Sequence, residues 1–344
     1  MSFTAQATAL CPGPLPDDVL PHLAAHARAA ELEVSENGTD LQVRLLAAQV
    51  DCGLSGGDLS VRIGAVDAIA LQQIREFVLH LLDHVAPGAG DRATWQGDIR
   101  RDAPPLNFCT ATVRSVRRVA PHFLRVEMDC DDTRRLAEGR GMHFSLLLPP
   151  EDRAPVWPRL DGTGRTVWPQ GDDALHRAVY TFVEFDIEAG RFTFDVFEHD
   201  GGRATGWARG AQPGDLVGIT GPGSGRFPPG DRLLIAGDET ALPAIRRILA
   251  RSEPDRTGQA FIEVGGPEDI CDMPRPDGIA LTWVLRDRGE ALWDHLSDLT
   301  PPEGDGRYVW VAAEKDLVRR AKARFRGDFG IGQDEGYFAF YWTA

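Results

Sequence analysis

The chain has few cysteines, few lysines and no long hydrophobic run. Its 5 cysteines are scattered and contain no Cys-x-x-Cys pair, which disfavours structural disulfides, a zinc site and an iron–sulfur cluster. No segment approaches the roughly 18 consecutive apolar residues of a membrane-spanning helix. The N-terminus also lacks the basic region and apolar block of a secretory signal. We therefore expect a cytoplasmic protein without membrane insertion.

Nearly all of the positive charge is carried by arginine, and acidic residues outnumber basic ones, 52 to 37. Only Lys315 and Lys322 are lysines, and the net charge is -15 at pH 7. This charge disfavours nucleic acid and anionic membranes as partners. It also disfavours strongly anionic small molecules, unless a local basic pocket opposes the global field. The length of 344 residues, 42% hydrophobic and 26% charged, is typical of a globular protein with two or three domains.

The N-terminal part, residues 1–88, is expected to form a small α+β domain. Residues 67–85 place apolar side chains at helical spacing, with Asp67 as a plausible N-cap. The residues before them alternate in polarity and contain glycine turns, as short antiparallel strands do. Residues 89–106, rich in Gly, Pro and charge, indicate a linker.

The remaining chain changes character twice. Residues 107–230 contain short strand-like runs with turns between them, a pattern typical of a small antiparallel barrel. A polar, Pro/Gly-rich insertion at 151–173 is expected to be a surface excursion. Residues 231–344 alternate between strand-like and helical stretches, which predicts a mostly parallel sheet whose ligands lie beyond the carboxyl ends of the strands.

Two histidine pairs, His22/His26 and His80/His84, have the i, i+4 spacing of a two-histidine metal site. Neither pair has an obvious acidic or cysteine partner nearby, so solvated helix faces are favoured over a metal site. No Gly-x-Ser-x-Gly elbow is present, and hydrolytic enzymes are disfavoured.

The stretch "AGDETALPAI" marks a strand end followed directly by a helix. Asp238 and Glu239 would repel a phosphate there, but they suit hydrogen bonds to ribose hydroxyls or to a nicotinamide amide. Simple capping of the helix by Asp238 or Thr240 is the alternative.

A second stretch, "EHDGGRATGWARGAQPGD", supplies His199, Thr205 and Trp207 next to a pair of glycines. Backbone N–H groups at the start of a helix, with a hydroxyl and an imidazole, suit a pyrophosphate. A tight turn with a packed tryptophan explains the same residues.

Three stretches in this order resemble one known family: "VWPRLDGTGRTVWPQGDDALHRAVYT", "HDGGRATGWARGAQPGD" and "LLIAGDETALPAIRRIL". They are similar to the siderophore-interacting proteins, which are FAD-dependent ferric-siderophore reductases of ferredoxin-reductase-like build. The resemblance covers about residues 107–344, and residues 1–88 resemble a small domain of unknown function sometimes joined to this family. It implies a multidomain α+β fold: the N-terminal α+β domain, an FAD-binding antiparallel β-barrel and a C-terminal α/β nicotinamide-binding domain with a parallel sheet.

The resemblance also implies a cofactor site, with the flavin rather than a side chain carrying the chemistry and no resident metal. In the family pattern R-x-Y-T-x-R, the tyrosine packs beside the isoalloxazine and the threonine bonds near its N5. The implied contacts are Tyr180 and Thr181 at the isoalloxazine with Arg177 as a substitute cation, His199, Ala204, Thr205 and Trp207 on the pyrophosphate or adenine side, Asp238, Glu239, Thr240 and Ala241 at the flavin–nicotinamide junction, and Arg286, Trp310 and Glu314 on the nicotinamide side.

The chain departs from the family at four basic positions, which are Ala178, Val183, Ser145 and Thr343 here. Arg177 stands one residue early, and a one-residue slip in a strand sends a side chain to the other face. Each lost charge-assisted hydrogen bond weakens anion binding by about 1.5–3 kcal/mol. A neutral or cationic ferric hydroxamate is therefore an easier substrate than a trianionic ferric catecholate.

The expected function is an FAD-dependent oxidoreductase that passes electrons from NADH or NADPH to Fe(III) in a siderophore chelate and releases Fe(II). Its expected partner is the ferric siderophore or another small-molecule electron acceptor, and the oligomeric state is left open. Two alternatives stand beside this reading. One is a non-catalytic siderophore- or partner-binding protein that has lost the flavin, and the other is a flavin reductase with a non-iron acceptor.

Overall fold

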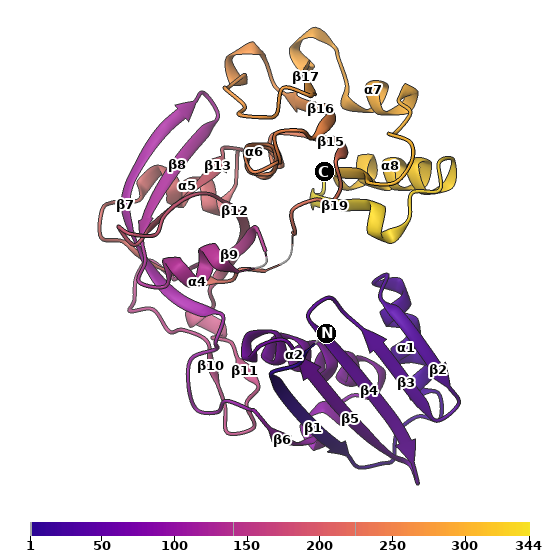
Figure 1. Cartoon of the computed structure of the whole chain (residues 1–344). Coiled ribbons are helices and arrows are strands. Elements are labelled where there is room, and N and C mark those ends of the chain that lie inside the picture. The colour runs from indigo at the N-terminus through magenta and orange to yellow at the C-terminus, as the bar shows by residue number, and fades with distance from the viewer. Residues whose placement is uncertain (1, 140, 224) are drawn as a thin grey trace. The chain divides into compact units, whose positions relative to one another are not determined.

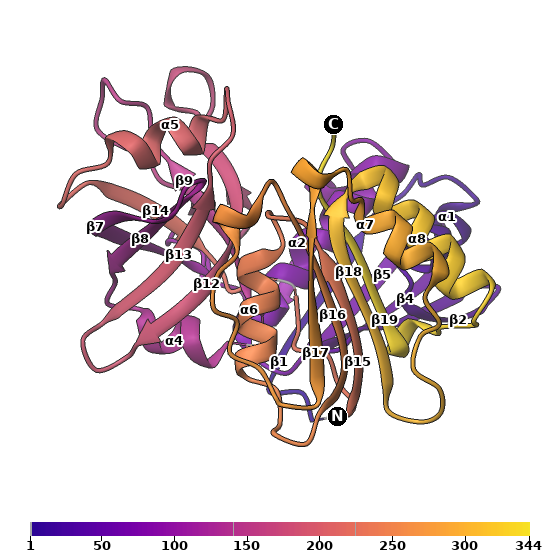
Figure 2. The same cartoon turned by 90° about the horizontal axis from the view of Figure 1, so that it is seen from above.

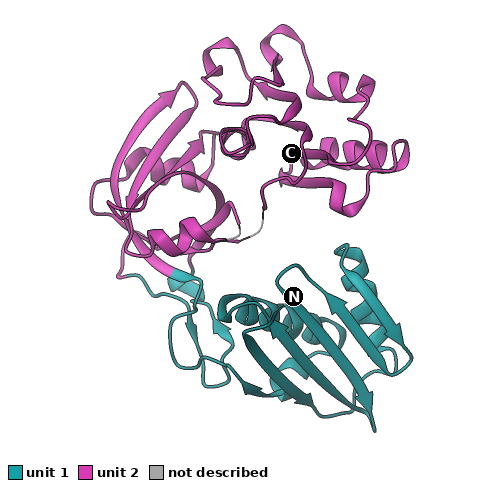
Figure 3. Cartoon of the chain, viewed as in Figure 1, with its two compact units in different colours: residues 1–108, 155–174 teal, residues 109–154, 175–344 magenta. Residues whose placement is uncertain are grey.

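The computed structural model describes residues 2–139, 141–223 and 225–344, which form two compact units. The first unit combines residues 1–108 with 155–174, and the second combines 109–154 with 175–344 (Figure 3). None of the helices in the described part of the chain is long and apolar enough to cross a bilayer.

The first unit is an antiparallel sheet with helices on one face (Figure 1). Its strand order is β2-β3-β4-β5-β1-β6. Burial alternates strictly along β1, so that one face packs on the helices and the other meets solvent. Asp67 caps the main helix by accepting a hydrogen bond from the Ala70 N–H at 2.8 Å, as the sequence predicted. The elements are β1 (Ala5–Cys11), α1 (Val19–Ala29), β2 (Glu33–Asn37), β3 (Asp40–Arg44), β4 (Ala48–Ser55), β5 (Asp58–Ala65), α2 (Ala68–Val85), α3 (Ala89–Arg92) and β6 (Thr94–Gly97).

Residues 89–106, expected as a linker, contribute structure to this unit. They contain α3 and β6, and β6 pairs antiparallel with β1 from Ala7↔Gly97 to Leu10↔Thr94. The strand is only four residues long and is flanked by glycine, so its local pattern resembles a loop. Its partner lies far back in the sequence, which hides the pairing from a local reading.

The insertion at 151–173 is likewise anchored rather than a free excursion. Residues 155–174 carry a two-strand hairpin, β10 (Arg159–Leu160) and β11 (Thr166–Val167), within the first unit. Arg165 forms ion pairs with Asp83, at 2.8 Å, and with Asp91. These charges explain why a polar segment can pack on a folded domain.

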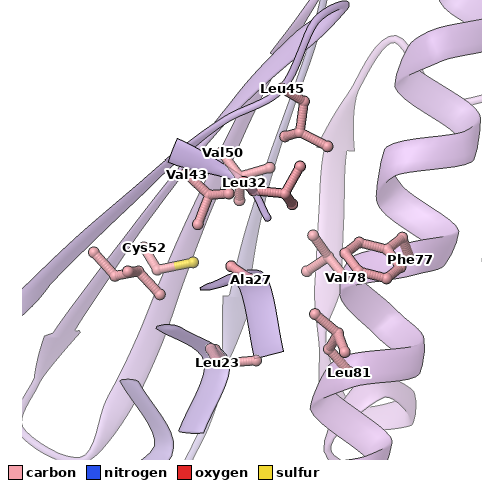
Figure 4. A pocket seen from close by; sticks show the side chains of 11 residues that line it. Leu23, Ala27, Leu32, Val43, Leu45, Val50, Cys52, Phe77, Val78 and Leu81 are labelled. Carbon is pink, nitrogen blue, oxygen red and sulfur yellow. The ribbon is translucent and has the colours of Figure 1, made fainter. Parts of the chain in front are cut away.

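A small cavity of about 30 Å³ lies between α1, α2, β3 and β4 (Figure 4). Its lining is entirely apolar, and an apolar cavity of this size stays dry. It offers no polar group to a chelate or a nucleotide. The lining residues are Leu23, Ala27, Leu32, Leu41, Val43, Leu45, Val50, Cys52, Phe77, Val78 and Leu81.

The second unit begins with a closed six-stranded antiparallel barrel in the order β12-β13-β8-β7-β14-β9. Phe144, Phe182, Phe192 and Phe194 fill its core, with Phe144 and Phe182 stacked at 4.4 Å between centroids. The barrel elements are β7 (Phe108–Ala120), β8 (Phe123–Asp129), α4 (Thr133–Glu138), β9 (His143–Leu148), β12 (His176–Asp186), β13 (Arg191–Phe197), α5 (Arg203–Gly210) and β14 (Leu216–Thr220).

A five-stranded parallel sheet, β17-β16-β15-β18-β19, completes the second unit. Helix α6 covers one face, and α7 and α8 cover the other (Figure 2). Because both faces are covered, β15 is apolar along almost its whole length. The fold class expected from the sequence is confirmed. The elements are β15 (Arg232–Gly237), α6 (Leu242–Ala250), β16 (Thr257–Val264), β17 (Ile279–Leu285), α7 (Leu292–Asp298), β18 (Arg307–Glu314), α8 (Lys315–Gly327) and β19 (Gly336–Trp342).

Candidate functional site

Strand β12 presents two different faces. Ala178 and Tyr180 pack against the barrel core, whereas Arg177 and Val179 are exposed. Arg177 therefore lies on the opposite face from Ala178, where the family pattern has its arginine. The pKa of the Tyr180 phenol is raised to about 12 by burial, so this side chain is a neutral aromatic at physiological pH.

Thr181, in the middle of β12, is buried and lies on the opposite face of the strand from Tyr180. It begins a chain of hydrogen bonds. Thr181 pairs in register with His143 on β9, and its Oγ1 lies 3.2 Å from His143 Nδ1. The other ring nitrogen, Nε2, lies 3.1 Å from the hydroxyl of Tyr341 on β19. The Thr181–His143–Tyr341 chain thus joins the barrel to the parallel sheet.

His143 is held in a neutral, fixed state. Burial, followed by the charge of Arg247, lowers the pKa of its imidazole to about 4. Gly225 adopts φ +84°, and a Cβ there would lie 2.2 Å from His143 Cδ2. Glycine is therefore required at this position for the ring to fit.

The Asp238 carboxylate hydrogen-bonds to groups at the carboxyl ends of neighbouring strands. Its Oδ1 accepts hydrogen bonds from the N–H and hydroxyl of Thr240, the former at 3.0 Å. Its Oδ2 accepts from the Glu314 N–H at 3.1 Å and from the Trp342 indole at 2.7 Å. The alternative of helix capping by Asp238 or Thr240 is wrong, because the N-cap of α6 is Ala241 and no side chain caps this helix. Asp238 instead links the ends of β15, β18 and β19.

Glu239 is 3% exposed and points to Arg286 rather than outward. Arg286 Nη1 lies 2.9 Å from Glu239 Oε2 and 2.8 Å from Glu263 Oε1. Burial raises the pKa of the Glu239 carboxyl, and the hydrogen bond from Arg286 opposes that rise. These two side chains form an internal ion pair at the edge of the predicted nicotinamide site.

Three further residues predicted for the nicotinamide side or the junction have structural contacts. Trp310 is 1% exposed and stacks on Tyr337, with 5.5 Å between ring centroids. Ala241 is fully buried. Trp310 and Ala241 would therefore influence a ligand only through packing. Glu314 caps α8 by accepting from the N–H groups of Asp316 and Leu317.

Helix α5 turns most of its predicted side chains toward the barrel. Ala204 and Thr205 are buried, and Trp207 stacks on Phe194 with 6.4 Å between centroids. His199 is exposed, and its backbone N–H donates to Thr205 Oγ1 at 3.4 Å. What this helix offers a ligand is its first turn of backbone N–H groups.

These groups are where a pyrophosphate, such as that of FAD, could be held. The N-cap, Gly202, makes no side-chain cap, so the first N–H groups have no intrahelical partner. A Cβ added at Gly206 would meet nothing within 4 Å, which leaves room on that side of the helix. Arg203, an exposed cation at the first helical position, lies close enough to His176 to lower its pKa, after burial. Because His176, Ala178 and Tyr180 share one face of β12, Arg203 brings positive charge to the face that Ala178 leaves neutral.

One histidine of each predicted pair contacts one histidine of the other pair. His26 and His84 lie edge to face, with 5.1 Å between ring centroids. Across residues 2–139, 141–223 and 225–344, no three His, Cys, Asp or Glu side chains gather as metal ligands.

Three residues of the site were not predicted from the sequence: His143, Tyr341 and Arg203. His143 stands two residues before Ser145, the departure that drew attention to this strand. A histidine inside an otherwise apolar strand is the signal that indicates a partnered imidazole.

Comparisons with known proteins identify the family of this chain. The model for the siderophore-interacting FAD-binding domain matches residues 112–226, and the model for the siderophore-interacting protein matches 230–344. The NADPH-dependent ferric-chelate reductase of Escherichia coli (strain K12) is 30% identical over 229 residues, covering 65% of this chain and 88% of that protein. The chain belongs to the siderophore-interacting protein family.

Other members of the family agree in sequence and structure. Ferric vibriobactin reductase ViuB of Vibrio cholerae is 28% identical over 236 residues, covering 65% of this chain and 85% of ViuB. A siderophore utilization protein from T. fusca superimposes with a TM-score of 0.62 at 28% identity, covering 71% and 95% of the two chains. SipS from Aeromonas hydrophila gives 0.59 at 26% identity, covering 69% and 92%. Both family models begin after the first unit's N-terminal segment, at residue 112 or later.

Proposed function

We propose that this siderophore-interacting protein is an FAD-dependent oxidoreductase that passes electrons from NAD(P)H to Fe(III) in a siderophore chelate and releases Fe(II). The carrying observation is the Thr181–His143–Tyr341 chain. It joins the barrel strand of Tyr180 and Thr181 to the strand ends of the parallel sheet, where ligands of such sheets bind. The relatives named above support the reaction. NAD(P)H is a cytoplasmic reductant, and we place the protein in that compartment.

The chain's own residues divide the work of binding FAD. Tyr180 and Thr181 would hold the isoalloxazine, and the start of α5 with Arg203 would hold the pyrophosphate. When bound, FAD supplies the conversion between two-electron oxidation of NAD(P)H and one-electron reduction of iron. The Asp238 hydrogen bonds fix the sheet edge against which the nicotinamide would lie.

The surface beside Thr181 favours a chelate of low negative charge. Ser145 pairs with Val179 on one side and Thr220 on the other, so these three neutral side chains share one face. Val179 is 69% exposed. Arg177 is the cation that β12 adds on this face. We therefore propose a neutral or cationic ferric hydroxamate as the preferred substrate over a trianionic ferric catecholate.

A steady-state assay with an Fe(II)-trapping dye tests this substrate class. We expect kcat/KM for a ferric hydroxamate to exceed that for a ferric tris-catecholate by tenfold or more, since about 1.4 kcal/mol corresponds to tenfold. Ser145→Lys, which adds a cation to the neutral face, should raise the catecholate value and leave the hydroxamate value within about twofold. Higher wild-type activity on the catecholate would contradict the proposed substrate class.

A further inference from the structure

The proposed reaction must release a proton from a buried place. Oxidation of one NAD(P)H by two Fe(III) ions yields NAD(P)+, two Fe(II) ions and one proton. If Thr181 stands at the reacting end of the cofactor, as proposed above, its surroundings decide how this proton leaves. Thr181 is 5% exposed and His143 is 6% exposed, so bulk water does not reach either side chain freely.

The Thr181–His143–Tyr341 chain has the chemistry of a proton path. A neutral imidazole carries one proton, so one ring nitrogen donates and the other accepts. The chain can run from the Thr181 hydroxyl to Nδ1 and from Nε2–H to the Tyr341 oxygen, or in the reverse direction. The two arrangements differ by the transfer of one proton along the chain, with no net charge left on any member.

We propose that Thr181, His143 and Tyr341 form a proton relay for the ferric reductase reaction. A proton arriving at Thr181 Oγ1 displaces the hydroxyl proton to His143 Nδ1. The proton on Nε2 passes to the Tyr341 oxygen, and the original Tyr341 proton leaves toward Tyr337 and solvent. Thr181 is the member that faces the reacting groups, while His143 and Tyr341 are positioning residues that act through it.

The groups around His143 favour passing the proton on over keeping it on the imidazole ring. Its ring faces Thr181, Tyr341 and the backbone of Gly225, with Arg247 as the nearby charge. The Arg247 guanidinium is fixed by a hydrogen bond to the Phe182 carbonyl at 2.8 Å. Its positive charge disfavours a resting imidazolium, so a proton that enters the ring is driven onward.

At the far end of the relay, Tyr337 and the Asp238 carboxylate influence the pKa of Tyr341. Burial raises the pKa of Tyr341, and the nearby Tyr337 and Asp238 raise it further. The phenol is therefore neutral, and it can accept a proton from Nε2 only as it gives its own away. Tyr337 is half-buried and lies on the same strand, which provides the step toward solvent.

The test uses His143→Gln, which keeps a polar side chain but cannot exchange tautomers, together with Tyr341→Phe. Tyr308→Phe serves as the matched control, because Tyr308 is a partly buried tyrosine of the same domain outside the relay. We expect both relay variants to bind FAD within about twofold of wild type and to lose about 10²-fold in the rate of Fe(III) reduction. Proton release, followed with a pH-indicator dye in a single turnover, should slow by the same factor.

Rescue separates a relay from a structural role. Added imidazole should restore the rate of His143→Gln at least tenfold and leave wild type and Tyr308→Phe unchanged. Wild-type rates in His143→Gln, or slow rates without rescue, would overturn the relay. A tenfold loss of FAD affinity in both relay variants would also overturn it, because the chain would then only hold the cofactor. Failure of wild type itself to bind FAD or to form Fe(II) would instead refute the proposed function.

Discussion

The carboxylate of Asp238 accepts the indole N–H of Trp342 at 2.7 Å, which ties the end of β15 to the end of β19. The same side chain accepts from Thr240 and from the Glu314 N–H. Asp238 is 5% exposed, so its hydrogen-bonding capacity is used inside the protein. Its contribution to a nicotinamide site is to hold the strand ends in place.

Asp238→Asn should therefore act mainly on stability. The amide replaces one acceptor oxygen by a donor, which leaves a buried N–H group without a partner. We expect the free energy of unfolding to fall by about 2–4 kcal/mol, since hydrogen bonds to a charged group are worth about 1.5–3 kcal/mol each. Urea unfolding measures this loss, and Asp200→Asn, at an exposed position, is the control. Unchanged stability with a tenfold higher KM for NAD(P)H would instead assign Asp238 to the nucleotide.

Arg286→Ala should make stability depend on the protonation of Glu239. Without Arg286 the buried carboxyl loses the group that opposes the rise of its pKa. The folded state then binds more protons than the unfolded state above the ordinary pKa of 4.5, and stability falls as pH rises through this range. We expect a loss of about 2 kcal/mol at pH 7, moderated because Arg286 is partly exposed, and recovery below pH 5. Guanidinium unfolding at several pH values measures it, and the double variant with Glu239→Gln should regain stability at pH 7. A pH-independent loss would contradict this account.

His143 should give the opposite pH dependence. Its pKa is lowered from 6.5 to about 4 in the folded protein, so the unfolded state binds more protons between these values. This contribution to the free energy of unfolding is fully present above pH 6.5 and is lost as pH falls. The loss reaches about 3 kcal/mol at pH 4. The difference between wild type and His143→Gln in unfolding free energy should change by this amount between pH 7 and pH 4. His80→Gln, at an exposed position, should show no such change, and a flat difference for His143→Gln would refute a buried neutral imidazole.

Arg203, rather than Arg177, should supply the cation for the FAD pyrophosphate. Arg203→Ala is expected to weaken FAD binding about 10- to 100-fold, as the loss of a charge-assisted hydrogen bond of about 1.5–3 kcal/mol implies. Arg177→Ala should change affinity less than about twofold, because its side chain lies on the opposite face of β12 from Tyr180. Quenching of FAD fluorescence on binding measures both. The reverse order of effects would return the pyrophosphate role to Arg177.

Local patterns in the sequence were sufficient for the barrel, the parallel sheet and the cap at Asp67. Alternation of polarity and strand–helix order are properties of neighbouring residues, and they survive into the fold. The sequence did not predict the features that depend on contacts between residues far apart in the chain. Strand β6 was taken for a linker because its partner is β1, and His143 was missed because Tyr341 lies 198 residues away.

For some candidate residues, the local sequence was enough to predict the position in the fold. Thr181 lies buried in the middle of the predicted strand, and Asp238 lies at the predicted turn. Whether a charged side chain would meet a ligand or another side chain could not be predicted. Glu239 and Arg286, 47 residues apart, neutralise one another through tertiary contact alone.

The most direct test of the account is the visible spectrum of the purified protein with added FAD, followed as NAD(P)H and then a ferric hydroxamate are supplied without oxygen. We predict flavin bands near 370 and 450 nm (rough values for oxidised flavin), bleached by NAD(P)H and restored by the chelate as Fe(II) appears. A protein that takes up no FAD would contradict the account and favour a chelate-binding role. A flavin that NAD(P)H bleaches but the ferric chelate does not restore would contradict iron as the acceptor.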